Sequence, residues 1–131
     1  MNPDDFFQIA DYLTNLQQVS NLSENILIRT AINRLYYGIF HLVQKELHIF
    51  IPQSEIHRCH AYVKEQIEDT KIRNDYSDLE EFRVDVDYNM LKIMKKYQYN
   101  DAKRIQQRIL NRISEPTILY DADDEFFQKN K

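Results

Sequence analysis

Hydrophobic residues recur every three or four positions between residues 27 and 43, which is the spacing of one face of an α-helix. The opposite face of this predicted helix is polar and carries Arg34, Tyr37 and His41. The predicted buried face consists of Leu27, Ile28, Ala31, Ile32, Leu35, Tyr36, Ile39, Leu42 and Val43. The pattern therefore predicts a helix with a core face and a second face that is free to contact a ligand or another subunit.

The single glycine of the sequence, Gly38, lies at the boundary between these two faces. Glycine inside a helix costs roughly 1 kcal/mol relative to alanine, so its presence here needs a reason in packing. We expect a tight helix crossing at Gly38, either within the chain or between two copies of it.

Capping and helix-breaking residues divide the chain into five predicted helices. Pro3 suits the first position of a helix, Ser77 and Glu80 have the spacing of a capping box, and Pro116 follows the last helix. The five helices are predicted over residues 3–18, 22–49, 55–71, 77–89 and 100–114. The second helix has three candidate caps, Ser20, Asn21 and Ser23, and the fifth begins at Asn100 or Asp101.

Composition supports an all-α fold. The chain of 131 residues has one glycine and three prolines, too few for the turns that β-hairpins require, and its length corresponds to about one domain. We therefore predict an all-α protein, with a single domain of five helices over residues 1–114. An acidic tail over residues 115–131 is predicted to be disordered.

Cysteine content and hydropathy indicate the compartment. Cys59 is the only cysteine, which excludes an internal disulfide and a cysteine-based zinc site. No apolar run approaches the roughly 20 residues of a membrane span, and the N-terminus is acidic where a signal peptide would be basic. We expect a cytoplasmic protein without a membrane segment.

Basic residues concentrate in one window of an otherwise acidic chain. Residues 92–112 hold seven Lys and Arg residues against Asp101 alone, a local charge of +6 in a chain of net charge −4. Arg104, Arg108 and Arg112 recur every four residues and so form a stripe on the predicted fifth helix. Such a stripe can follow an RNA backbone, contact the acidic tail of a neighbouring molecule, or simply be a solvated helix face.

Two segments resemble the signatures of one family. The stretch RTAINRLYYGIFHLV, residues 29–43, resembles the R-A-x-S-R-x-Y-Y-A-x-F-H helix of one branch of the HEPN (higher eukaryotes and prokaryotes nucleotide-binding) domains. LEEFRVDVDYN, residues 79–89, resembles the L-x-x-x-R-x-x-A-D-Y segment of the same branch. The resemblance implies a small up-and-down helical bundle that forms a homodimer through its polar faces. It also implies a partner, a minimal nucleotidyltransferase that acts as the antitoxin to a HEPN toxin.

Many HEPN proteins are metal-independent endoribonucleases, and their motif is an arginine and a histidine with four to six residues between them. Histidine can take a proton from a ribose 2′-hydroxyl near neutral pH, and a guanidinium can hold the phosphate. The resemblance thus makes Arg34, His41 and Arg83 the candidate catalytic residues. Tyr37 and Tyr88 are candidates for binding RNA or a nucleotide, together with the arginine stripe. Two chains that meet at this motif would build one composite site.

The fourth predicted helix departs from that motif. Tyr88 occupies the position of the expected histidine, and its ordinary pKa near 10 makes it a poor base at pH 7. Asp85 and Asp87 would also repel a phosphate, and a salt bridge from Arg83 to Glu80 or Asp87 is an equally good structural explanation. The alternative is therefore a non-catalytic helical module that binds RNA, a nucleotide or a partner protein. Along the same helix, Leu79, Phe82, Val86 and Met90 are predicted to be buried.

We expect no metal and no cofactor. One glycine cannot supply a P-loop or a G-x-G-x-x-G motif, and no glutamate precedes a histidine by three residues, as a di-iron bundle requires. His57 and His60 lie one turn apart around Cys59, but this pair alone is a weak metal-site signal.

Overall fold

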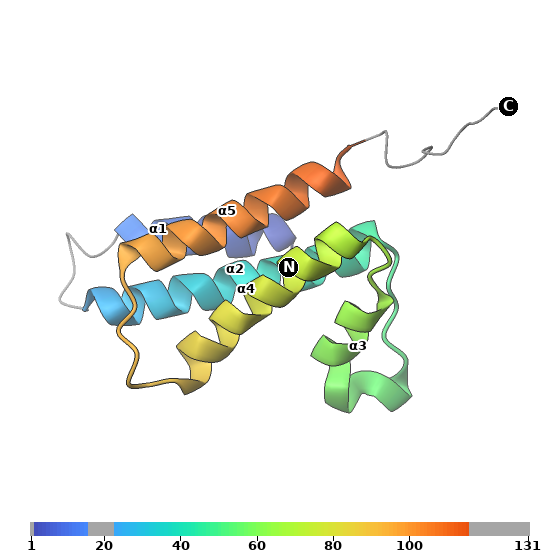
Figure 1. The fold of residues 1–131 in the computed structure, drawn as a ribbon, viewed down its shortest axis with the longest axis horizontal. Coiled ribbons are helices and arrows are strands. Elements are labelled where there is room, and N and C mark those ends of the chain that lie inside the picture. The colour runs from blue at the N-terminus through green and yellow to red at the C-terminus, as the bar shows by residue number, and fades with distance from the viewer. Residues whose placement is uncertain (1, 16–22, 116–131) are drawn as a thin grey trace, which may run out of the picture.

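The computed structural model describes residues 2–15 and 23–115, and within them it contains helices and connections but no strand (Figure 1). The elements are α1 (Pro3–Asn15), α2 (Glu24–Glu46), the 3-10 helix η2 (Gln53–Arg58), α3 (Cys59–Gln66), α4 (Thr70–Tyr88) and α5 (Lys96–Ile113). The prediction of an all-α protein is confirmed for these residues. The predicted tail lies outside them from position 116 onward.

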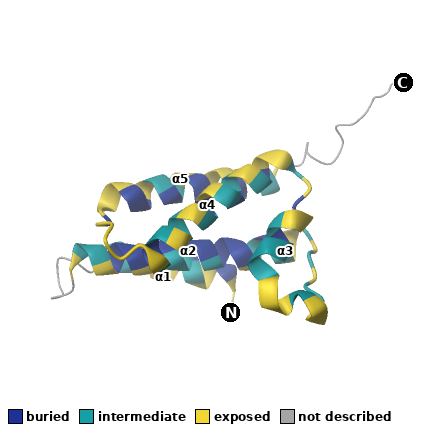
Figure 2. Ribbon diagram, turned by 60° about the horizontal axis from the view of Figure 1, so that its bottom comes forward, coloured by how far each residue is buried: buried dark blue, intermediate teal, exposed yellow. Residues whose placement is uncertain are grey.

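The central element is α2, which packs against α1, α3, α4 and α5. Figure 2 shows its buried residues running along the middle of the molecule, with exposed residues on the outer surfaces of the other helices. The predicted core face of α2 is confirmed, with every residue buried except Leu42, which is half-buried. Tyr36, Tyr76, Ile32, Leu35 and Leu79 are among the largest fully buried side chains.

Gly38 marks a crossing inside the chain, because the aromatic ring of Phe7 from α1 lies over it. A Cβ atom placed on Gly38 would be 2.3 Å from Cε1 of Phe7 and 2.7 Å from Cδ1. No side chain fits in that space, so the glycine lets α1 lie close against α2. The sequence had left open whether this contact joins two helices of one chain or two chains.

The central part of the second predicted helix is confirmed, but the observed helix is shorter than the prediction at both ends. Ser23 is its N-cap, and the Ser23 hydroxyl accepts a hydrogen bond from the backbone N–H of Ile26 at 3.3 Å. The helix ends at Glu46 rather than 49, because His48 adopts the left-handed conformation with φ of 57°. Ser20 and Asn21, the other candidate caps, lie outside the described residues.

The third and fourth predicted helices have wrong boundaries. The segment predicted as one helix over 55–71 is a 3-10 turn followed by α3, and the chain leaves helical geometry after Gln66. Asp69, not Ser77, caps α4: its carboxylate accepts from the backbone N–H of Ile72 at 3.0 Å. Ser77 lies inside α4, so the capping-box pattern there was misleading.

The fifth helix begins at Lys96, several residues before the predicted start. Gln98 secures this end, since its side-chain oxygen accepts from the backbone N–H of Lys95 at 2.6 Å. Glu24 of α2 also accepts from the backbone N–H of Lys96 at 3.1 Å. The N-cap residue is Lys95, which is not a usual capping residue, and Glu24 belongs to a distant helix. Neither feature can be recognised from the local sequence, which is why the capping residues Asn100 and Asp101 were predicted as the start.

Arg29 is a structural residue that the sequence pattern did not reveal. Its guanidinium is buried and donates to the backbone carbonyls of Val86 at 2.9 Å and Asn89 at 2.8 Å, and also to those of Asp85 and Lys92. These acceptors belong to the end of α4 and the connection to α5, so Arg29 holds that connection against α2. Met90 lies in this connection and is 70% exposed, which corrects the prediction that it is buried.

Candidate functional site

Basic and aromatic side chains from α1, α2, α3 and α4 meet in one cluster, which we call the aromatic–basic cluster. The ring contacts and cation–π contacts that define it join consecutive members at about 4.5–6.2 Å. Its members are Phe6, Arg34, Tyr36, Tyr37, Phe40, His41, His60, Tyr76 and Arg83. The candidates Arg34, Tyr37, His41 and Arg83 are therefore brought together within a single chain.

Arg34 lies between two aromatic rings on the polar side of α2. Its Cζ is 5.5 Å from the centre of the Phe6 ring and 5.4 Å from that of Tyr37. Both contacts are within the range of a cation–π interaction. Arg34 Nε also donates to the side-chain oxygen of Asn33 at 3.0 Å. The polar face predicted for α2 is thus partly covered, because the Phe6 ring of α1 packs against one side of the guanidinium.

His41 lies two turns beyond Arg34 along α2 and is exposed on its outer side. Its ring stacks on that of Phe6 with centroids 5.3 Å apart and an interplanar angle of 28°. The packed rings partly desolvate the imidazole, which lowers its pKa below the ordinary value. His41 is therefore largely neutral at pH 7 and can accept a proton.

His60 of α3 joins the cluster from a helix that carries no part of either motif. Its Nδ1 is 2.8 Å from the Tyr36 hydroxyl, which in turn is 2.9 Å from the Tyr76 hydroxyl. Burial lowers the pKa of His60, and the charge of Arg83 lowers it further. Sequence reasoning weighed His60 only as a metal ligand. The available signal was Tyr36 itself, since a tyrosine on a buried helix face needs a partner for its hydroxyl.

Arg83 reaches the cluster from α4 and stacks on Tyr36, with its Cζ 5.2 Å from the ring centre. Its side chain is 11% exposed, and Nη1 is 3.5 Å from a carboxylate oxygen of Asp87. The salt bridge weighed from the sequence is therefore present, and it coexists with membership of the cluster. Arg83 Nε is buried and has no hydrogen-bond partner among the described residues.

A polar chain connects the two arginines through residues that the sequence analysis did not single out for this purpose. Asn33 accepts from Arg34 and donates from its own amide nitrogen to Asp87 at 3.0 Å. Asp87 then pairs with Arg83. This chain links α2 to α4 and sets the position of one guanidinium relative to the other.

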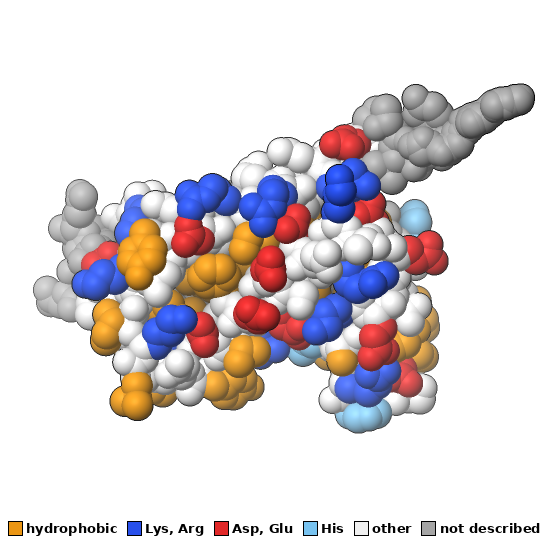
Figure 3. Space-filling view, viewed as in Figure 1, with side chains coloured by type: hydrophobic (Ala, Val, Ile, Leu, Met, Phe, Trp, Pro, Cys, Tyr) orange, Lys and Arg blue, Asp and Glu red, His pale blue; other side chains and the backbone are white. Residues whose placement is uncertain are grey.

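Tyr88 stands apart from the cluster. It is the last residue of α4 and is 72% exposed. Its neighbours in the sequence are also exposed and hydrophobic, and hydrophobic side chains are visible on this part of the surface in Figure 3. These exposed residues are Met90, Leu91, Ile93 and Tyr97.

The arginine stripe of α5 is paired with carboxylates along its length. Figure 3 shows Lys and Arg side chains following α5 with acidic side chains beside them. Arg104 pairs with Asp101, Arg108 with Asp75 at 2.9 Å, and Arg112 with Asp69 at 3.0 Å. An RNA phosphate at this stripe would have to displace these carboxylates, each of which lies on the chain's own surface.

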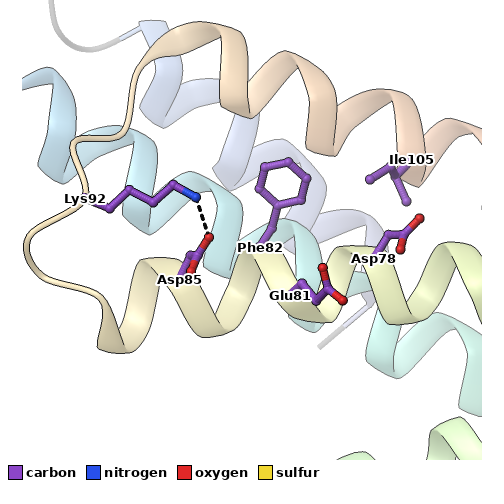
Figure 4. Close-up of a pocket in the computed structure, with 6 residues that line it drawn as sticks. All are labelled: Asp78, Glu81, Phe82, Asp85, Lys92 and Ile105. Atoms are coloured by element: carbon purple, nitrogen blue, oxygen red, sulfur yellow. Dashed lines mark hydrogen bonds and ion pairs between the residues drawn. The ribbon is translucent and has the colours of Figure 1, made fainter.

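A separate pocket of about 340 Å³ lies between α4 and α5, beside the connection that joins them (Figure 4). Three of its side chains are the carboxylates of Asp78, Glu81 and Asp85, the last of which pairs with Lys92 at 2.7 Å. Phe82 and Ile105 complete the lining. None of the predicted site residues lines this pocket, and its negative charge does not suit a phosphate.

Two further features of the described residues bear on function. Within them, no group of three or more His, Cys, Asp or Glu side chains is arranged to hold a metal ion. Among the same residues, none of the helices has the length and hydrophobicity to cross a membrane.

Over the described residues the protein is all-helical, and one cluster at its central helix brings together two guanidinium groups and two imidazoles. No family model, no curated protein and no solved structure matches the chain. Its function therefore has to be inferred from the chemistry of the cluster and from the motifs in its sequence.

Proposed function

We propose that this chain is a HEPN-like toxin of a toxin–antitoxin or defence system, a metal-independent endoribonuclease that acts on RNA as a dimer. The observation that carries the proposal is that Arg34 and Arg83 belong to the same cluster as His41 and His60, two histidines whose pKa values are lowered. This is the combination of groups that phosphodiester cleavage needs: fixed positive charge for the phosphate and an imidazole that is neutral at pH 7.

RNA cleavage at such a site uses the 2′-hydroxyl of the substrate as the nucleophile. A neutral imidazole removes the hydroxyl proton, and the guanidinium groups stabilise the negative charge that grows on the phosphate oxygens. The 2′-oxygen binds phosphorus as the bond to the 5′-oxygen breaks, which produces a 2′,3′-cyclic phosphate and a 5′-hydroxyl. Each of these steps can be carried out by side chains of the cluster.

The resemblance of residues 29–43 and 79–89 to HEPN signatures supports the finer parts of the proposal. On this basis the helices form an up-and-down bundle, two chains pair through their polar faces, and the dimer lies in the cytoplasm. The cognate partner would be a nucleotidyltransferase that acts as antitoxin. Sedimentation at high micromolar concentration tests the assembly, because a monomer under those conditions would refute it.

The catalytic proposal is tested by incubating the protein with total RNA in the presence of EDTA. His41→Ala should lower the cleavage rate by about 10²–10⁴-fold, the usual contribution of a catalytic acid or base. Arg83→Ala should lower it by about 10²–10³-fold, the usual contribution of one group that stabilises developing charge. His57→Ala and Arg58→Ala are matched controls, because both residues are exposed and belong to η2, outside the cluster. An inert wild type, or equal cleavage by all variants, would refute the proposal.

A non-catalytic module that binds RNA, a nucleotide or a partner protein is the second candidate. The observation that favours it is Tyr88, which occupies the motif position of the expected histidine and lies outside the cluster. Fluorescence anisotropy with a labelled RNA would identify such a module by binding without cleavage, weakening steeply as salt rises. Arg104→Ala, Arg108→Ala and Arg112→Ala would each reduce that salt dependence if the stripe of α5 contacts the backbone.

A further inference from the structure

A single aromatic ring separates His60 from each of the two guanidinium groups. The Tyr37 ring is 5.6 Å from the His60 ring and is also the ring on which Arg34 rests. The Tyr36 ring is 5.5 Å from the His60 ring and is the ring on which Arg83 rests. A phosphate held by the two arginines would therefore lie beside His60, although α3 contains neither motif.

The two ring nitrogens of His60 differ in their surroundings. Nδ1 faces inward, toward the hydroxyls of Tyr36 and Tyr76, and both tyrosines are fully buried. Nε2 lies on the other side of the ring and has no hydrogen-bond partner within the described part of the chain. Burial raises the pKa of both tyrosines, so each keeps its hydroxyl proton at neutral pH.

We propose that His60 is the general base of the site, in the tautomer protonated on Nδ1, and that Tyr36 is the positioning residue that holds its ring in place. In this arrangement Nδ1–H of His60 donates to the Tyr36 oxygen, and Tyr36 donates its own hydrogen to Tyr76. Nε2 is then unprotonated and free to accept a proton. The inference rests on the proposed endoribonuclease function and adds a catalytic residue to it.

The step balances without a metal or a further reactant. The 2′-hydroxyl proton moves to Nε2 of His60 while the 2′-oxygen forms its bond to phosphorus. The bond between phosphorus and the 5′-oxygen breaks, and a water molecule hydrogen-bonded to His41 supplies the proton for the departing oxygen. The hydroxide left behind is neutralised when the His60 imidazolium returns its proton to solvent. Throughout, Nδ1–H keeps its hydrogen bond to Tyr36.

The pH dependence of this step follows from the groups that face His60. Arg83 and His41 act to lower its pKa, Glu80 acts to raise it, and Glu80 is itself paired with Lys64 at 3.0 Å. Because desolvation and Arg83 prevail, the pKa lies below its ordinary value, and a base is active only when neutral. We expect kcat/KM to rise with pH up to the His60 pKa and then to stay level through neutrality.

Cleavage of total RNA in EDTA by His60→Gln, Tyr36→Phe and His57→Gln tests the assignment. His60→Gln should lower the rate by about 10²–10⁴-fold and abolish the rise at low pH, whereas His57→Gln should match the wild type. Tyr36→Phe should shift the pH profile while the fold is kept, as judged by circular dichroism. Wild-type activity retained in full by His60→Gln would overturn the role of His60 and leave the proposed function standing. An inert wild type would overturn both.

A measurement on the unaltered protein covers the case in which a variant does not fold. Nitrogen-15 NMR of the imidazoles reports which ring nitrogen carries the proton. Neutral His60 should be protonated on Nδ1, and its Nε2 signal should shift when a 2′-deoxy dinucleotide is added as an uncleavable substrate mimic. Protonation on Nε2 in the neutral form, or no response to the mimic, would overturn the inference.

Discussion

Replacing Gly38 with alanine tests the contact between α1 and α2 in one step. On an isolated helix this change is stabilising by about 1 kcal/mol, because alanine has the higher helix propensity. In this protein the new methyl group would lie 2.3, 2.7 and 3.0 Å from three ring atoms of Phe7, where ordinary van der Waals contacts are 3.4–4 Å. The Phe7 ring is buried, so it must move by about 1 Å inside a packed core.

The magnitude follows from setting these two effects against each other. Overpacking of a core costs typically about 1–3 kcal/mol, which exceeds the gain in propensity over most of its range. Gly38→Ala should therefore lower the free energy of unfolding by up to about 2 kcal/mol, measured by urea denaturation followed by helical circular dichroism.

A double-mutant cycle supplies the control. Phe7→Leu removes the ring atoms that the methyl group would meet, so Gly38→Ala in that background should be neutral or stabilising by up to about 1 kcal/mol. The reasoning would be refuted if Gly38→Ala stabilised the otherwise unaltered protein, or if its effect were the same with Phe7 and with leucine at that position.

Three further predictions concern stability. Arg29→Met leaves buried carbonyls of the α4–α5 connection without a donor and should cost roughly 3 kcal/mol in urea denaturation, while Arg29→Lys should lose less. Asp69→Ala removes both the α4 cap and the Arg112 partner and should cost about 1–2 kcal/mol, whereas Asp69→Asn keeps the cap and should cost less. His60 has a folded-state pKa below its ordinary value of about 6.5, so the folded protein binds fewer protons than the unfolded chain. The free energy of unfolding should therefore fall as the pH drops from 7 through about 6.5 toward the lower folded-state pKa of His60. In His60→Gln this dependence on pH should be weaker, as measured by thermal melting curves at several pH values.

Helix boundaries show where local sequence signals were enough. Ser23 caps α2 as one of the predicted candidates, since its hydroxyl accepts from a backbone N–H three residues away. The start of α4 could not be predicted from local signals alone. Asp69 is one of many acidic residues in the sequence, and its carboxylate is also held in place by Arg112 of α5. Ser77 and Glu80 match a capping box, but they fall where tertiary packing continues a helix that has already begun.

The candidate site divides in a similar way. Arg34, His41 and Arg83 were found because their spacing matches a motif, whereas His60 was missed as a member of this site. Its contact with Tyr36 joins positions 24 residues apart across a turn that interrupts the predicted third helix. Asn33 and Asp87, which link the two arginines, are 54 residues apart.

The sequence by itself determined that the protein is helical and that α2 has a core face, because helix propensity and hydrophobic period are properties of neighbouring residues. Only the tertiary structure decided what covers the other face. Phe6, His60 and Arg83 reach Arg34, Tyr36 and Tyr37 through the packing of four helices, which depends on the shapes and hydrogen-bonding needs of groups far apart in the chain. The arrangement of the imidazoles and guanidiniums is therefore a result of folding, not of any single segment.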